Sequence, residues 1–356
     1  MTRTLTRTAS WSYYQARLAA VLVLAFAAYA SAQIGGDPDT LAGQASLEVE
    51  RQGDGTFRTQ AGIDVEPLVR NGALYAVRMR SGSFDVEAAH EFAALVGAAT
   101  GFGESIEQAV LDFLDGALPE LAGSGPSVVG IERFRLTLDV TAGEEPFEAT
   151  FALALAEVSE DAFPPSRHTK GPDDAAIVIR EFSDFQCPAC RRFVAEVLPM
   201  LEASLLPRGD VRIEFHHFPL IGSFANSFRA AEVAECVVDA NPDDDQAFWS
   251  YHDEIYERQP QWAPLADPDD TFLAIADEVG LETAGVESCL ADGRHVQTVQ
   301  DAYQAAAALQ LRGTPSVFVG GFQVDNFVDL SAYHRAIGYL ETFGMADAHE
   351  DSPGAD

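Results

Sequence analysis

The residues best suited to chemistry are two cysteines spaced by two residues, in Cys187-Pro188-Ala189-Cys190. This spacing brings both sulfur atoms within bonding distance at the start of a helix, so the pair can alternate between dithiol and disulfide. The free N–H groups of a helix N-terminus favour an anion, which predicts a stabilised thiolate and a depressed pKa at Cys187. Cys190, one turn further on, is expected to be the shielded resolving thiol. The motif predicts thiol–disulfide exchange.

The flanking segments predict the elements that position this pair. A run rich in β-branched residues, Ala175–Phe182, is typical of a buried central strand. Apolar residues at helical spacing follow over Arg191–Leu206, and Pro188 stands where the first turn of that helix needs no N–H donor. The cysteines are therefore expected at a strand-to-helix junction.

Two other uses of the motif remain open from the residues alone, namely half of a zinc site and an inert short-loop disulfide. Zinc requires two more ligands, and the sequence has no second pair of this spacing. His216 and His217 are candidates, but consecutive residues of a strand point to opposite faces. We therefore expect no metal.

Composition excludes several classes of function. The 356 residues include 56 acidic and 22 basic side chains, a formal charge of −34, with 47% hydrophobic residues. Such a chain has enough apolar surface for two folded domains. Its charge repels polyanions, so nucleic acid and anionic membrane surfaces are not expected as partners.

The first 32 residues have the pattern of a signal peptide. Arginines precede the apolar stretch Leu18–Ala28, and Ala30-Ser31-Ala32 offers a cleavage site. An uncleaved N-terminal anchor is the alternative. Export to the periplasm or cell envelope follows in either case, and disulfides persist in that compartment.

Residues 33–158 predict a separate α+β domain. Strands are expected at Ala45–Gln52, Ala73–Arg80, Val128–Val140 and Phe147–Val158, and helices at Val86–Ala99 and Glu104–Leu121. No motif in this block indicates a chemical role. Two prolines and a Gly-Pro pair in residues 159–173 predict a linker.

From about residue 170 to 345 the sequence resembles the DsbA-type thiol–disulfide oxidoreductases of the thioredoxin superfamily. The resemblance rests on EFSDFQCPAC at 181–190, on RGTPSVFV at 312–319, and on a closing helix at Leu330–Phe343. It implies an α/β, thioredoxin-like domain over 174–345 with a helical insertion over about 220–311. Helices in the insertion are expected at Phe224–Val238, Gln246–Glu257, Asp270–Val279 and Ala291–Leu311.

The resemblance also implies roles for individual residues. Glu181 matches the buried acid that takes the proton of the resolving thiol, although an exposed strand-end acid is the alternative and Asp184 a second candidate. Thr314 and Pro315 match the cis-proline loop, whose backbone pairs with an extended substrate chain. No cofactor is implied beyond the redox-active disulfide Cys187–Cys190.

Cys236 and Cys289 fall in the predicted insertion. An exported protein rarely leaves two thiols free, so we expect a structural disulfide, with two buried unpaired cysteines as the alternative. Residues 346–356 are acidic and predict a disordered tail.

The function favoured by these observations is formation of disulfides in exported client proteins that contain cysteines. A membrane-bound or soluble redox partner would then reset the enzyme. The alternatives are a disulfide isomerase or reductase whose N-terminal domain dimerises, and a redox-silent binding protein.

Overall fold

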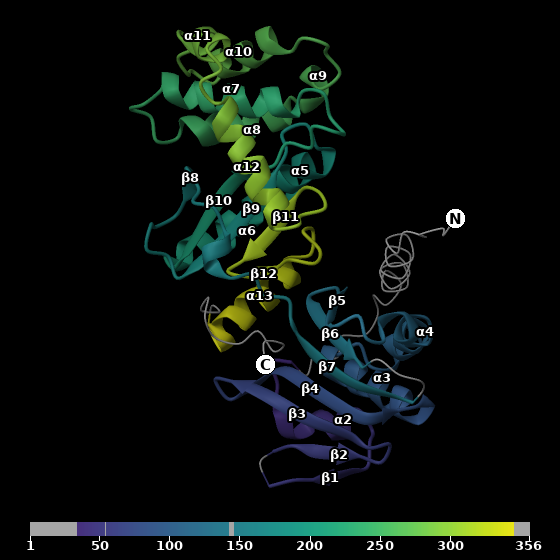
Figure 1. The fold of residues 1–356 in the computed structure, drawn as a ribbon. Coiled ribbons are helices and arrows are strands. Elements are labelled where there is room, and N and C mark those ends of the chain that lie inside the picture. The colour runs from purple at the N-terminus through teal and green to yellow at the C-terminus, as the bar shows by residue number, and fades with distance from the viewer. Residues whose placement is uncertain (1–33, 54, 142–145, 345–356) are drawn as a thin grey trace, which may run out of the picture. The chain divides into compact units, whose positions relative to one another are not determined.

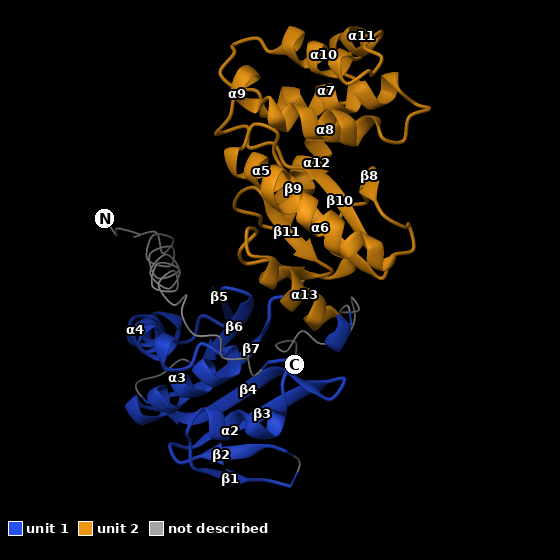
Figure 2. Ribbon diagram, turned by 180° about the vertical axis from the view of Figure 1, so that it is seen from behind, with its two compact units in different colours: residues 1–157, 341–356 blue, residues 158–340 orange. Residues whose placement is uncertain are grey.

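The computed structural model describes residues 34–53, 55–141 and 146–344 (Figure 1). The chain divides into two compact units: the first runs to Glu157 and includes the residues from Glu341 onward, and the second is Val158–Leu340 (Figure 2). The predicted signal peptide, residues 1–32, and the predicted tail, residues 346–356, lie outside the described residues. Within the described ranges, no helix has the length and apolar character needed to cross a membrane.

The first unit is an antiparallel seven-stranded sheet in the order β1-β2-β3-β4-β7-β6-β5, with helices packed against it. Asp85 caps α3 by accepting a hydrogen bond from the Ala88 N–H at 3.0 Å, and Gly101 ends that helix in a left-handed conformation. The elements are η1 (Pro38–Thr40), α2 (Leu41–Gln44), β1 (Val49–Arg51), β2 (Phe57–Thr59), β3 (Ile63–Arg70), β4 (Ala73–Phe84), α3 (Val86–Thr100), α4 (Glu104–Leu121), β5 (Ser127–Ile131), β6 (Phe134–Val140) and β7 (Phe147–Leu155).

This unit has the α+β character expected from the sequence, but two details of the prediction are wrong. The expected single strand Val128–Val140 is the hairpin β5–β6, which reverses at Glu132 with a φ of 51°. No glycine or proline stands at this turn, so the continuous apolar alternation concealed it. Strand β3 was not predicted, although it pairs with almost the full length of β4.

The second unit is built on a five-stranded sheet in the order β12-β11-β9-β10-β8. The central strand β9 is buried at every position and pairs in parallel with β10 and antiparallel with β11. Its Cα partners place Glu181 beside Phe215 on one side and Val317 on the other. The strands are β8 (His168–Lys170), β9 (Ile177–Ser183), β10 (Val211–His217), β11 (Ser316–Val319) and β12 (Phe322–Gln323).

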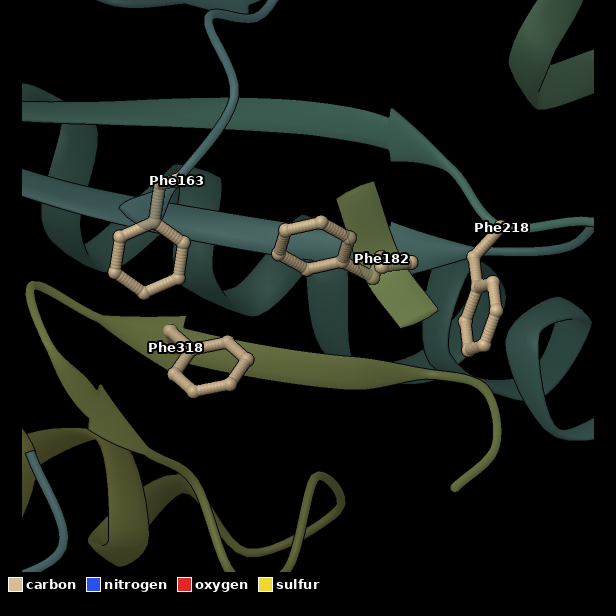
Figure 3. Packing of buried hydrophobic residues seen from close by; sticks show 5 residues of the cluster. Phe163, Phe182, Phe218 and Phe318 are labelled. Atoms are coloured by element: carbon tan, nitrogen blue, oxygen red, sulfur yellow. The ribbon is translucent and has the colours of Figure 1, made fainter. Parts of the chain in front are cut away.

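One face of this sheet carries an aromatic cluster that fixes β9 and β11 against each other. Phe182 from β9, Phe318 from β11 and Phe163 from the preceding segment pack together, with Phe218 beyond the end of β10 (Figure 3). Ala306 of α12 covers the cluster. Because side chains alternate along a strand, Phe182 on this face requires Glu181 and Ser183 to lie on the other.

The helices of the second unit surround the sheet and form the insertion. They are η2 (Glu160–Ala162), α5 (Pro188–Arg192), the π-helical turn η3 (Phe193–Val197), α6 (Leu198–Leu205), η4 (Leu206–Arg208), α7 (Ser227–Ala240), α8 (Ala247–Glu257), α9 (Gln259–Trp262), α10 (Asp269–Glu278), α11 (Val286–Ala291), α12 (Val296–Ala308) and α13 (Leu330–Phe343).

Three features of this unit differ from the prediction. The expected helix Ala291–Leu311 is interrupted at Gly293, whose φ of 62° separates α11 from α12. The segment 159–173, expected as a linker, contains β8, which pairs with β10 and completes the sheet. Strand β8 has three residues, too few for its periodicity to be recognised. The short helix α9 was also not predicted.

Candidate active site

The thiol pair lies where the central strand ends and the next helix begins, as the sequence predicts. Cys187 caps α5, Pro188 is its first residue, and the Cys187 carbonyl accepts from the Arg191 N–H at 3.1 Å. Both cysteines are unbonded thiols; the Cys187 residue is 6% exposed and Cys190 fully buried. An attacking sulfur can therefore reach Cys187 but not Cys190.

The surroundings separate the two thiols electrostatically. A hydrogen bond from the Cys190 thiol, followed by the Thr314 side chain and the N–H groups of Cys190 and Ala189, lowers the pKa of the Cys187 thiol to about 6. Burial raises the pKa of the Cys190 thiol well above its ordinary value, and the neighbouring Cys187 adds to that rise. At neutral pH the dithiol is thus a Cys187 thiolate beside a protonated Cys190.

The loop before β11 faces this pair. Its Thr314–Pro315 peptide bond is cis, and the Cys187 thiol donates a hydrogen bond to the Thr314 carbonyl oxygen, with Sγ and O 3.4 Å apart. The Thr314 Oγ1 atom is buried and has no oxygen or nitrogen partner among the described residues. Its hydroxyl is free to donate to a thiolate.

Glu181 lies on the same face of β9 as Ser183 and is 1% exposed, which excludes the alternative of an exposed strand-end acid. Burial raises the pKa of its carboxyl to about 8, and neither carboxylate oxygen is hydrogen-bonded within the described part of the chain. Ser183 Oγ lies 3.0 Å from the Tyr256 hydroxyl, so β9 and α8 meet beside this acid. A carboxyl with a pKa near neutrality can both accept and release a proton.

Asp184, the second candidate proton carrier, has a different environment. Its carboxylate accepts from the Gln186 and Leu220 N–H groups, each at 2.7 Å, and from the Ser227 hydroxyl at 2.7 and 2.8 Å. These donors occupy both oxygens. Asp184 therefore ties the active-site segment to the loop after β10 and to α7.

Several residues that support the site come from the insertion and were not predicted. The Gln259 side-chain amide at the start of α9 donates to the carbonyl oxygens of Phe185 and Cys187, at 2.7 and 3.0 Å. Gln186 accepts from the Asn226 N–H at 2.6 Å and donates to the Ala263 carbonyl oxygen at 2.8 Å. Glutamine and asparagine carry no signal of such a role in sequence, because only the fold brings them to the cysteines.

His216 and His217 do not approach the thiol pair as zinc ligands. His216 Nε2 lies 3.3 Å from Glu214, and His217 Nε2 lies 3.0 Å from Glu235. Among the described residues, the two groups compact enough for a metal ion are Cys236, Cys289 and His295, and His168, His217 and Glu235. Neither group includes Cys187 or Cys190.

Cys236 of α7 and Cys289 of α11 are bonded to each other, with an S–S distance of 1.95 Å. The bond closes a segment of 53 residues and lies in the buried part of the insertion. It is therefore separate from the Cys187–Cys190 pair and cannot take part in exchange without opening the insertion.

Several known proteins are similar to this chain. The family described as thioredoxin matches residues 164–338. A probable disulfide bond formation protein D of Bacillus cereus is 32% identical over 160 residues, which cover 44% of this chain and 71% of the relative. Disulfide bond formation protein D of Bacillus subtilis is 28% identical and is covered to 73%, against 47% of this chain. The crystal structure of oxidised BdbD from Bacillus subtilis matches with a TM-score of 0.45 and 22% identity, covering 52% of this chain and 96% of that one.

The thiol pair at the end of the central strand and the similarity to these relatives lead to one conclusion. The chain belongs to the disulfide bond formation protein D family of DsbA-type, thioredoxin-superfamily oxidoreductases, and it is a protein-disulfide oxidoreductase.

Proposed function

We propose that the protein is exported and forms disulfides in client proteins through the Cys187–Cys190 pair. A client thiolate attacks Cys187 Sγ of the oxidised pair; the bond between the two sulfurs breaks, and Cys190 leaves with the electron pair and takes up a proton. The second client thiolate then attacks the client sulfur of the mixed disulfide and releases Cys187 as a thiolate. The client loses two electrons and two protons; the reduced enzyme, with a Cys187 thiolate and a Cys190 thiol, takes both electrons and one proton, and the other proton goes to solvent.

The observation that carries this direction is the opposite displacement of the two thiol pKa values. A lowered pKa at Cys187 makes it the better leaving group, and the stabilised thiolate favours the reduced enzyme. The raised pKa of Cys190 ensures that this sulfur is protonated once it has left. When the dithiol form of an enzyme is stabilised relative to its disulfide form, the enzyme accepts electrons readily and therefore oxidises its clients.

Glu181 and Thr314 have supporting roles in the proposed reaction. With a pKa of about 8, Glu181 is mostly protonated at neutral pH and supplies the proton that Cys190 takes up; in the reverse step its carboxylate removes that proton. The Thr314 backbone lies against Cys187, where an extended client chain can pair with it as an added strand.

Export is supported by the signal-like pattern of residues 1–32 and by the Cys236–Cys289 bond, which is typical of proteins outside the reducing cytosol. The residues named above at the thiol site all belong to the second unit, Val158–Leu340. A redox partner must return the dithiol to the disulfide after each turnover.

The test is the equilibrium reduction potential of Cys187–Cys190 in glutathione buffers. Quenching with a thiol-alkylating reagent and quantifying the peptide that contains both cysteines leaves the Cys236–Cys289 bond intact. We expect a potential of about −120 to −150 mV, the range of a strong oxidant. A value of about −200 mV or lower would favour the isomerase or reductase alternative. A pair that does not exchange with glutathione at all would leave only the redox-silent binding protein.

A further inference from the structure

A cavity of about 400 Å³ lies beside the cis-proline loop, and the proposed reaction does not use it. Its wall is formed by the end of the α12 segment, the loop itself and one residue of β12, including Leu309, Leu311, Arg312, Thr314, Pro315 and Gln323. Thr314 belongs both to this wall and to the thiol site, since its carbonyl oxygen lies 3.4 Å from Cys187 Sγ. A client chain held at Thr314 must therefore pass next to this cavity.

The cavity wall is anchored to the core rather than to a loose loop. Leu309 and Leu311 are partly buried and pack against the cluster of Phe182, Phe318 and Ala306. The Ser316 hydroxyl donates to the Gly313 carbonyl oxygen at 2.8 Å, which ties the loop to the start of β11. A preformed wall costs little ordering free energy when a ligand side chain enters.

The charge of this wall is opposite to that of the molecule. The chain carries 56 acidic residues, yet the described residues lining the cavity include none, and they include the arginine Arg312. Arg312 is exposed, and within the described ranges it makes no hydrogen bond or ion pair. Other arginines of this unit do find carboxylates, as Arg212 does with Glu214 and Arg229 with Asp269. Arg312 thus presents an uncompensated positive charge at the edge of the thiol site.

From this juxtaposition we infer that the cavity is a subsite for a client side chain next to the reacting cysteine, and that Arg312 selects a carboxylate there. The inference rests on the proposed function, because it names the class of client segment that the same site prefers: an extended chain with Asp or Glu close to its cysteine. The attraction acts locally, whereas the net charge of −34 repels every acidic client at long range.

The experiment compares how fast the oxidised enzyme reacts with dithiol peptides that differ at one residue. Glu, Gln or Lys is placed at each of two positions on either side of the attacking cysteine, and the measured quantity is the ratio of second-order rate constants for Glu and Gln. The variants are R312Q, R312K and R80Q. Arg80 is an exposed arginine of the first unit, so R80Q removes the same formal charge far from the described thiol site in sequence.

At one or more of the peptide positions, R312Q should lower the Glu-to-Gln ratio by about two- to fivefold at low salt, as for an exposed ion pair. R80Q and R312K should keep the wild-type ratio at the same positions. The difference in this ratio between R312Q and the wild type should shrink in 0.5 M NaCl, because at that ionic strength charges are screened over a distance of roughly a few ångströms. R312Q should still oxidise the Gln peptide, which shows that the variant is folded and active.

If all peptides are oxidised but R312Q and R80Q give equal ratios at every position, Arg312 does not select carboxylates and the inference is overturned while the proposed function stands. If the wild-type enzyme exchanges with no peptide, the proposed function itself falls, and the subsite falls with it.

Discussion

Two identical side chains in one turn of helix have opposite chemistry because they differ in hydrogen bonding and burial. Cys187 is partly accessible and receives donors from the Cys190 thiol, Thr314 and two backbone N–H groups. Cys190 lies one turn deeper, where no water can stabilise its thiolate. The asymmetry that exchange requires therefore comes from position alone.

Alkylation of the reduced protein by iodoacetamide measures this asymmetry. Because only the thiolate reacts, the rate at Cys187 should rise with pH through a midpoint at about 6. In C190A the main donor to that thiolate is lost, and the midpoint should move upward toward the ordinary cysteine value, about 8.5. C190S keeps a donor and should lie between the two. A wild-type midpoint near that ordinary value would contradict the structure; C187A, which should lack the early phase, is the control.

At the scale of elements, the active-site turn is held by the insertion as much as by the sheet. Strand β9 ends at Ser183, and the carbonyl oxygens of Phe185 and Cys187 that follow it are met by the side chain of Gln259 on α9. Asp184 makes a second tie, to Ser227 on α7. The insertion therefore positions the start of α5, and through it the Cys187 thiolate.

Replacing Gln259 tests this connection. Q259A removes the side-chain donor of the buried Phe185 carbonyl and one of two donors to the Cys187 carbonyl, which keeps the Arg191 N–H. Because a buried carbonyl that loses its donor costs about 1–3 kcal/mol, we expect the free energy of unfolding to fall by about 1–3 kcal/mol in urea titrations followed by tryptophan fluorescence. Q261A, an exposed glutamine of the same short helix, is the matched control and should change stability by about 0.5 kcal/mol or less. Equal effects of the two variants would show that the contact with the turn does not stabilise it.

At the scale of the whole molecule, stability and redox chemistry oppose each other at Glu181. A buried carboxyl without hydrogen bonds disfavours ionisation, so its pKa is about 8 in the folded protein against about 4.3 in an unfolded chain. Because the pKa of Glu181 is higher in the folded than in the unfolded state, its protonated form stabilises the folded state fully at pH values below the unfolded-state pKa. This contribution to the free energy of unfolding is lost as the pH rises toward 8.

The pH dependence of unfolding should therefore change in E181Q. The wild-type free energy of unfolding should decline between about pH 4.5 and 8. In E181Q, which has no carboxyl to ionise at this position, the decline should be smaller by an amount on the order of 5 kcal/mol. Trp249 and Trp262, the tryptophans of the described residues, both lie in the second unit, so their fluorescence follows the unit that contains Glu181. Parallel pH profiles for the wild type and E181Q would mean that Glu181 is not buried as an isolated acid.

Much of this architecture is encoded locally and could be predicted. The motif of Cys187 and Cys190, the strand before it and the helix after it follow from spacing, periodicity and Pro188, which depend only on nearby residues. The closing helix Leu330–Phe343, which belongs to the family resemblance, is also present. The β5–β6 turn and β8 could not be predicted, because neither has a local residue signal.

The tertiary structure alone decided which distant groups surround the thiols. It brings Thr314, which is 127 residues away, to 3.4 Å from Cys187 Sγ, and it buries Glu181 without a hydrogen bond to its carboxylate in the described structure. It also leaves Asp184 fully hydrogen-bonded, although Asp184 and Glu181 are both acids of the same segment. Burial and partners depend on how the sheet and the insertion pack, so the pKa values that set the chemistry are properties of the fold.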